Sequence, residues 1–192
     1  MRIGIDLRGL SADEQVVVAG QADQLGLWAL LIDDADGHEA VTAAELATAT
    51  TDVHLAVWFA DDHPHTIAED VAVLDQLSQR RMLAIVAREH PVVRALLAGQ
   101  TVDGVALAPP PAQTAVPVWH PNDVEIVELT GDLAADRLVI DQRRDTGTTH
   151  LFVSWPGELA TLARHLVTRA AGPAFPQLVA DLADRLPGET RT

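Results

Sequence analysis

The sequence contains no cysteine, no lysine and no tyrosine among its 192 residues. Without cysteine the chain can form no disulfide, no thiolate zinc site and no iron–sulfur cluster, and it has no thiol nucleophile. Without lysine it can form no Schiff base, which excludes covalent attachment of pyridoxal phosphate. Chemistry must therefore come from carboxylate, imidazole, hydroxyl and guanidinium groups, or from a bound cofactor.

Positive charge is also scarce. Thirteen basic residues stand against 28 acidic ones, which gives a net charge of −15 and a pI near 4.7. Because nucleic acids and anionic membranes are bound chiefly through basic residues, we expect neither as a partner. No apolar run reaches the ~18 residues of a membrane-spanning helix, and the N-terminus lacks a signal-peptide pattern. We therefore expect a cytoplasmic protein.

Short apolar runs alternate with helical patterns along most of the chain. Runs without polar alternation are typical of parallel strands that are covered on both faces. A spacing of roughly 25 residues per strand and helix predicts right-handed crossovers and a parallel sheet. The turn after the first run lacks the GxGxxG pattern, which favours a (β/α) barrel over an open dinucleotide-binding sheet. Strands are expected at 2–7, 27–32, 53–59, 82–86, 102–107 and 150–155.

Capping boxes predict where three helices begin, at Ser11 with Glu14, Thr42 with Glu45, and Thr66 with Glu69. The middle of the chain is less regular, because three consecutive prolines require a loop within 108–114. Brief strands are expected at 116–119 and 124–129, and 133–144 fits a helix or a strand. We predict one α/β domain over 1–192, a TIM-type (β/α) barrel that is trimmed or incomplete and irregular and shortened at 108–148.

Polar residues cluster where the predicted strands end. In a parallel barrel the loops after the strands converge on one face, where active sites lie. A histidine on this face can act as an acid, a base or a ligand near neutral pH. Solvated loop residues give the same pattern, so a structural role for each stays open. The histidines concerned are His38, His63, His65, His90 and His120.

A divalent metal is a further possibility for such a histidine and aspartate cluster. Metal-dependent barrel hydrolases favour a His-x-His pair on the first strand, whereas His63 and His65 straddle a proline after the third. Serine chemistry is not favoured either, because Ser154 lies in SWPG and not in a G-x-S-x-G elbow. A metal-dependent barrel hydrolase is therefore the less favoured alternative.

The segment from His63 to Met82, HPHTIAEDVAVLDQLSQRRM, carries a specific resemblance. It resembles bacterial luciferase-like oxidoreductases, in which a His-Pro pair after the third barrel strand leads into a helix ending in Leu-Asp-x-Leu-Ser. Here that ending runs from Leu74 to Ser78. MRIGIDL, GLWALLIDD and TAAELATATTDVHLAVWF are similar to the family's first strand, its second strand and the helix that leads into its third. VPVWHP and THLFVSWPGE are similar to its late strands.

The resemblance implies a TIM barrel that binds FMN or a deazaflavin at the carboxyl ends of its strands and oxidises or reduces a small organic substrate. It implies that His38 or His63 acts as the catalytic acid or base. Ring contacts are implied at Val57, Trp58 and the loop that holds Asp61 and His65, with the phosphate near Arg143, Arg144 and the turn from Ser154 to Gly157. Arg88, after the fourth strand, is a further candidate for cofactor binding.

Two functions of different classes stay open at this point. The first is a flavin- or deazaflavin-dependent oxidoreductase or monooxygenase that acts on a small molecule. The second is a non-catalytic family member that serves as the partner subunit of a full-length oxidoreductase. Such a subunit would have no bound cofactor. Arg88 would discriminate, because a side chain that fills the barrel mouth abolishes binding. An incomplete sheet leaves strand edges unpaired, so we expect a homodimer or a heterodimer with a related subunit.

Overall fold

The computed structural model describes residues 1–33, 37–59, 63–88, 90–157, 159 and 161–162. In this part of the chain a seven-stranded sheet is accompanied by five α-helices and one 3₁₀ helix. The strands are β1 (Arg2–Asp6), β2 (Ala29–Ile32), β3 (His54–Phe59), β4 (Met82–Val86), β5 (Val118–Trp119), β6 (Ile126–Glu128) and β7 (His150–Ser154). The helices are α1 (Ala12–Gln24), α2 (Glu39–Ala49), α3 (Pro64–Leu77), α4 (Pro91–Leu97), η1 (Pro121–Asp123) and α5 (Leu133–Asp145).

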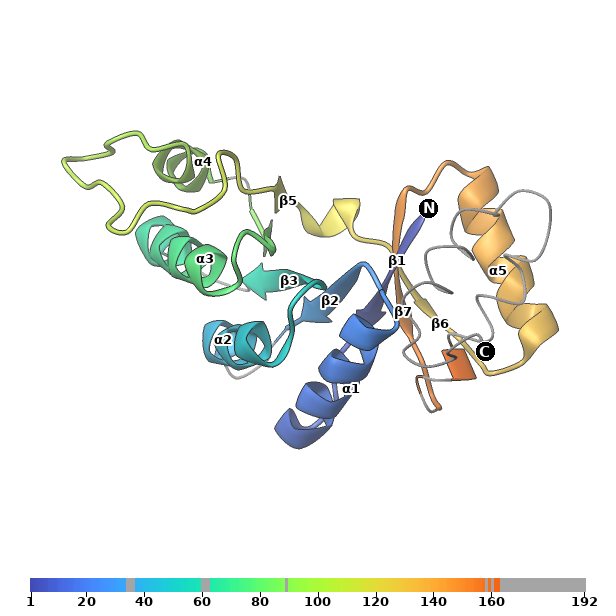
Figure 1. The fold of residues 1–192 in the computed structure, drawn as a ribbon. Coiled ribbons are helices and arrows are strands. Elements are labelled where there is room, and N and C mark those ends of the chain that lie inside the picture. Colours follow the sequence, from blue (N-terminus) through green and yellow to red (C-terminus); the bar gives the residue numbers. More distant parts are fainter. Residues whose placement is uncertain (34–36, 60–62, 89, 158, 160, 163–192) are drawn as a thin grey trace, which may run out of the picture.

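The sheet has the strand order of a barrel that is open at one place. All six strand pairs are parallel, and the order is β5-β4-β3-β2-β1-β7-β6. Reading β6-β7-β1-β2-β3-β4-β5 follows the cyclic order of a (β/α) barrel with the break between β5 and β6. The sheet curls, and α1, α2 and α3 lie along its outer side (Figure 1). The prediction of a trimmed α/β barrel is confirmed.

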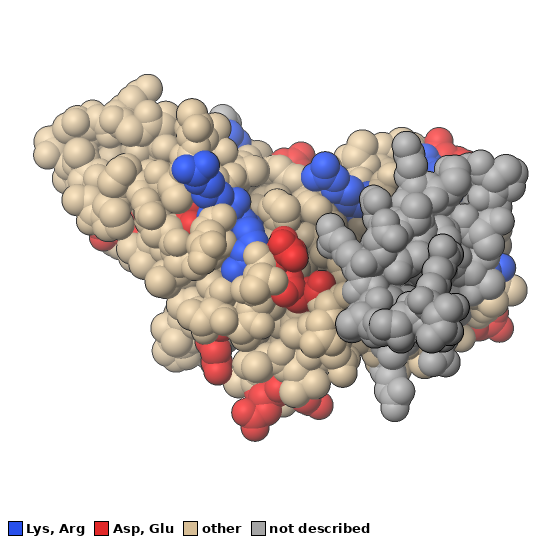
Figure 2. Space-filling view, viewed as in Figure 1, with Lys and Arg blue, Asp and Glu red and all other residues tan. Residues whose placement is uncertain are grey.

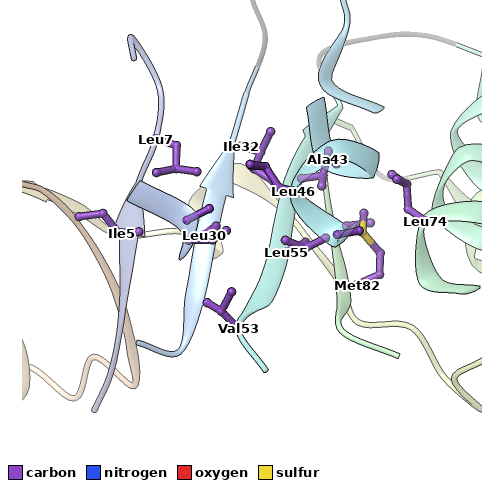
Figure 3. Close-up of a cluster of buried hydrophobic side chains, with 14 of the residues drawn as sticks. Ile5, Leu7, Leu30, Ile32, Ala43, Leu46, Val53, Leu55, Leu74 and Met82 are labelled. Atoms are coloured by element: carbon purple, nitrogen blue, oxygen red, sulfur yellow. The ribbon is translucent and has the colours of Figure 1, made fainter. Parts of the chain in front are cut away.

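The main core lies between the outer face of the sheet and the helices. Alternate strand residues such as Leu30, Leu55 and Met82 are fully or almost fully buried there. Figure 3 shows these side chains in one cluster with Leu46 of α2 and Leu74 of α3. This layer fixes the strands, and so it fixes where their carboxyl ends lie.

The inner face of the curled sheet carries a second, smaller core. Its members alternate with those of the outer core along the same strands, as the two-residue repeat of a strand requires. They are Ala29, Leu31, Ala56, Leu83, Ile85 and Phe152, with Trp28, Trp58, Trp119, Val124 and Ile126 packed against them. The inside of the curl is therefore filled by side chains.

Gly4 gives this inner packing a direct test. A methyl group at Gly4 would lie 2.7 Å from the carbonyl oxygen of Ala29 and 2.7 Å from two ring carbons of Phe152. We expect Gly4→Ala to lower the free energy of unfolding by roughly 1–3 kcal/mol in urea titrations, because the core is overpacked. Gly20, inside α1, has nothing within 4 Å of such a methyl. Gly20→Ala should stabilise the protein by roughly 0.5–1 kcal/mol, and equal stabilities of the two variants would contradict this packing.

The strand predicted at 102–107 is wrong. These residues form a tight turn in which Val102 and Val105 make one isolated antiparallel bridge. Asp103 and Gly104 both have positive φ, at 50° and 81°. Asp-Gly is a preferred pair for such a turn, and this signal outweighs the apolar character of the flanking residues.

One of the three predicted capping boxes is confirmed. The Ser11 amide and hydroxyl donate to Glu14 Oε2 at 2.9 and 2.6 Å. The other two helix starts are wrong, because α2 begins at Glu39 and α3 at Pro64. Proline suits the first turn of a helix, where its missing N–H leaves no bond unmade, so α3 begins before Thr66.

The region expected to be irregular, 108–148, contains both loops and regular elements. No helix or strand lies within 108–114, as the prolines predict. Gln113 connects this loop to α3, because its backbone N–H and its side-chain Nε2 each donate to the buried Asp75 carboxylate at 2.7 Å. The short strands expected nearby are present as β5 and β6. Residues 133–144 are helical, since the Asp132 carboxylate accepts from the amides of Ala134 and Ala135 and caps α5.

Candidate active site at the strand mouth

Polar side chains gather at the carboxyl ends of the central strands, a region that we call the mouth. Asp6 ends β1 and Ser154 ends β7, which pairs with β1. Glu128 ends β6, and its Cα is paired with that of Ser154. Trp58, near the end of β3, belongs to the inner face. The parallel sheet therefore brings together groups from positions up to 148 residues apart.

Asp6 and Arg8 form a two-pronged ion pair in the mouth. Arg8 Nε donates to Asp6 Oδ1 at 2.8 Å, and Nη2 donates to Oδ2 at 2.9 Å. The Ser154 hydroxyl donates to the same Oδ2 at 3.0 Å. The Asp6 side chain is only 5% exposed, and its hydrogen bond to Arg8 is the main reason why the pKa of Arg8 is raised. Such a fork fixes the plane of the guanidinium as well as its position.

A short turn holds Arg8 in place. The Arg8 amide donates to Asp6 Oδ1 at 3.1 Å, and the Leu10 amide donates to the Leu7 carbonyl at 3.2 Å. Gly9 has φ of 80°, a conformation that glycine adopts without strain. Gln15 Nε2 of α1 donates to the Leu10 carbonyl at 3.1 Å. From this turn the Arg8 guanidinium carbon reaches 5.9 Å from the centre of the Trp58 ring, within range of a cation–π contact.

A depression of about 720 Å³ opens beside this pair. Its lining residues are Asp6, Arg8, Gly9, Ile126, Val127, Glu128, Arg143 and Ser154. Arg143 Nε lies 3.0 Å from Glu125 Oε1, and 42% of the Arg143 side chain is exposed. Basic and acidic side chains lie together in the middle of the face shown in Figure 2. The volume is in the range of small-molecule sites, and the lining offers both donors and acceptors.

The opposite end of the inner face is packed with aromatic rings. The Trp28 ring lies 5.7 Å from Trp119 and 4.4 Å from His150, and Trp119 lies 5.1 Å from His150, all between centroids. His54 and Phe152 lie 6.2 and 5.6 Å from Trp28. Burial lowers the pKa of both histidines, and the charge of Arg2 lowers them further. Aromatic rings and two histidines whose protonation is disfavoured therefore pack together at this end of the inner face.

Solved structures with a similar fold are oxidoreductases. The coenzyme F420-dependent tetrahydromethanopterin reductase from Methanopyrus kandleri matches with a TM-score of 0.54 at 12% identity, over 94% of this chain and 82% of that one. The monooxygenase RslO1 from Streptomyces bottropensis matches with a TM-score of 0.50 at 18% identity, over 100% of this chain and 68% of that one. The fold is that of the luciferase-like oxidoreductases. No protein-family model and no curated protein matched the chain.

The luciferase-like fold places both predicted catalytic histidines on the mouth side of the sheet. His38 directly precedes α2 and follows β2, and His63 directly precedes α3 and follows β3. Both are exposed, and neither side chain caps its helix. Because β2 and β3 are paired neighbours, their loops open on the same side. Asp61, predicted in the same loop as His63, lies outside the described residues.

The predicted cofactor residues do not all face the mouth. The side chain of Val57 is fully buried in the core between the sheet and the helices, so it does not face the mouth. Trp58 faces inward and Ser154 binds Asp6, which brings these two close to Arg8.

The remaining predicted cofactor residues are not brought close to Arg8 by any contact in the described part of the chain. His65 lies in the first turn of α3, and its Nε2 is buried without a hydrogen-bond partner among the described residues. Arg88 and Gly157 are exposed.

Arg8 is the functional candidate that the sequence interpretation did not assign to the site. The arginine over the inner aromatic ring is Arg8, whereas Arg88 after β4 is solvent-exposed. A signal was present, since Asp6-Leu7-Arg8-Gly9 places a carboxylate two residues before an arginine and ahead of a turn glycine. Two residues apart on a turn, the two side chains can pair within one loop.

Two further observations concern the described residues alone. Among them, no three His, Cys, Asp or Glu side chains lie close enough together to hold a metal ion. The metal-dependent hydrolase alternative thus has no candidate site in this part of the protein. Likewise, no helix in the described ranges has both the length and the apolar character needed to cross a membrane.

Proposed function

We propose that this protein is an oxidoreductase that binds FMN or a deazaflavin in the mouth and acts on a small organic substrate. The observation that carries the proposal is the network of Asp6, Arg8, Ser154 and Trp58 beside a depression of ligand size, on a sheet with the luciferase-like strand order. When bound, the ring would supply the hydride or oxygen chemistry, and the protein would supply binding and orientation.

The residues present suit a planar, carbonyl-bearing ring with an anionic tail. Arg8 lies over the Trp58 ring and offers guanidinium N–H groups at the edge of the depression. Arg143 and Ser154 also line the depression, and we assign the phosphate to Arg143. Arg88, which follows β4, and His65, in the first turn of α3, are further candidates for contact with the cofactor. His38 or His63 would act as acid or base, since both are exposed to solvent on this side.

Binding of FMN and of a deazaflavin by the purified protein tests the proposal. We expect the fluorescence of at least one of the two cofactors to be quenched on titration, with binding at micromolar concentration. Trp58→Leu should weaken this binding about tenfold, because the ring over which Arg8 lies is lost, whereas Trp58→Phe should retain most of it. Thermal melting of each variant controls for folding. Absence of binding of both cofactors to the folded wild-type protein would refute the proposal.

A non-catalytic partner subunit is the second candidate, and one observation favours it. Among the described residues the sheet is open between β5 and β6, and each of these strands has one edge without a strand partner there. Unpaired edges favour association with another chain, either a second copy or a related oxidoreductase subunit. Light scattering after size-exclusion chromatography tests this. A dimer that binds neither cofactor would favour the partner role, and a monomer at all concentrations would count against a homodimer.

A further inference from the structure

Arg8 is the residue through which Trp58 is connected to the depression. Its side chain lines the depression and at the same time lies over the Trp58 ring. It remains 31% exposed although both oxygens of Asp6 are bound to it. A ligand ring placed beside Trp58 therefore meets the Arg8 guanidinium first.

The ion pair leaves much of the guanidinium available. Of the five N–H groups of an arginine side chain, two are used by Asp6, and the rest have no hydrogen-bond partner among the described residues. Asp6 is itself held by Ser154, and the turn that carries Arg8 is held by Gln15. The free N–H groups are thus presented from a rigid support, which lowers the entropy lost on binding.

We propose that Arg8 is the ring-recognition residue of the mouth, and that its guanidinium N–H groups bind the carbonyl edge of a planar heteroaromatic ring. Asp6 and Ser154 are positioning residues that hold the guanidinium against Trp58. This inference rests on the proposed function, because it concerns the same site. It assigns Arg8 to the ring and Arg143 to the phosphate, since Arg8 is the arginine that lies over Trp58.

Three ligands distinguish binding of the ring from binding of the phosphate. They are FMN, lumiflavin, which has the ring alone, and inorganic phosphate. We expect Arg8→Gln to weaken FMN and lumiflavin by the same factor of about ten or more, because a charge-assisted hydrogen bond is lost from the ring. Phosphate should not compete for lumiflavin. Arg8→Lys keeps the charge but lacks the planar fork, so its affinity for the flavins should lie between those of the wild type and Arg8→Gln. Asp6→Asn should weaken binding less than Arg8→Gln does. Arg80→Gln, an exposed arginine before β4, is the matched control.

The midpoint potential of bound FMN supplies a measurement that altered folding alone would not move in a fixed direction. Arg8→Gln leaves the Asp6 carboxylate without its counter-charge beside the ring, which disfavours the anionic reduced form, so the potential should be more negative than in the wild type. If Arg8→Gln weakens FMN but not lumiflavin, Arg8 meets the phosphate and the assignment is overturned. If neither Arg8→Gln nor Arg8→Lys changes binding, the inference fails while the proposed function stands. If wild-type protein binds neither flavin, both fail.

Discussion

Replacing Arg81 by methionine should lower the free energy of unfolding by about 3 kcal/mol or more, the largest effect that we expect from one side chain. The Arg81 residue is 8% exposed. Its Nε donates to the Ser78 carbonyl at 2.7 Å, and its two terminal nitrogens donate to carbonyls at the end of α2 and before β3. Methionine fills a similar volume but donates nothing, so these buried carbonyls would lose their partners.

The geometry explains why the loss should be large. The carbonyls of Ala47 and Thr50, at 2.9 and 3.0 Å from Nη2, belong to the last turn of α2, where no intrahelical donor remains. The Val53 carbonyl, 2.7 Å from Nη1, lies one residue before β3. One planar group thus joins α2, β3 and the start of β4. Burial lowers the pKa of Arg81, and the carboxylates of Asp23 and Asp52 act in the opposite direction.

Two matched variants make this a test of hydrogen-bond geometry. Arg81→Lys keeps the charge, but an ammonium cannot follow the planar fork, so it should lose most of the same stability. Arg80→Gln alters the neighbouring exposed arginine and should change stability by less than about 0.5 kcal/mol. Urea unfolding followed by circular dichroism gives the three values. An Arg81→Met protein within 1 kcal/mol of wild type would show that these carbonyls find other donors.

The parallel architecture could be predicted from the sequence because it depends on strong local signals. Each of β1, β2, β3, β4 and β7 lies within an apolar run that was expected to be a strand. The failures arose where two local signals compete. Asp103-Gly104 imposed a turn on an apolar segment, and Pro64 started α3 before the Thr66 capping pair. Within 133–144 the charged residues interrupt the apolar pattern, so the sequence did not distinguish a helix from a strand, and the structure has a helix whose buried side includes Ile140.

The position of the mouth could be predicted from the sequence, but the contacts between its side chains could not. Parallel topology alone places the ends of β1, β3 and β7 on one side, so Trp58 and Ser154 could be assigned to that region from the resemblance. The pairing of Asp6 with Ser154 could not, since it joins residues 148 apart through a strand register that the sequence does not reveal. The inward or outward direction of neighbours such as Val57 and Trp58 also depends on that register.

The ring cluster around Trp28 compensates for the break in the sheet. β5 has only two residues, and its other edge has no strand partner in the described sheet. Trp119 of β5 stacks on Trp28, which precedes β2, so aromatic contact spans the inside of the curl where strand pairing cannot close it. The lowered pKa values of His54 and His150 keep their rings uncharged at and above neutral pH, which suits contact with Trp28.

Trp28→Ala should therefore destabilise the protein by about 3 kcal/mol, because it removes the ring that contacts Trp119, His150 and Phe152 together. Trp28→Phe should recover much of this. Trp58→Ala should cost less, because Trp58 packs on the inner core and against Arg8 but has no aromatic ring contact among the described residues. Unfolding is best measured at pH 8, well above the pKa values of both histidines, so that their protonation does not contribute.

Amide hydrogen exchange locates the effect within the sheet. If the Trp28 stack holds β5 on β4, exchange at Val118 and Trp119 should accelerate in Trp28→Ala more than exchange within β3, which is paired on both sides. A uniform acceleration across β3, β4 and β5 would mean that Trp28 stabilises the whole domain and not the open edge. Exchange at β5 that matches wild type would show that pairing with β4 alone is sufficient, and that the ring cluster does not substitute for the missing strand contact.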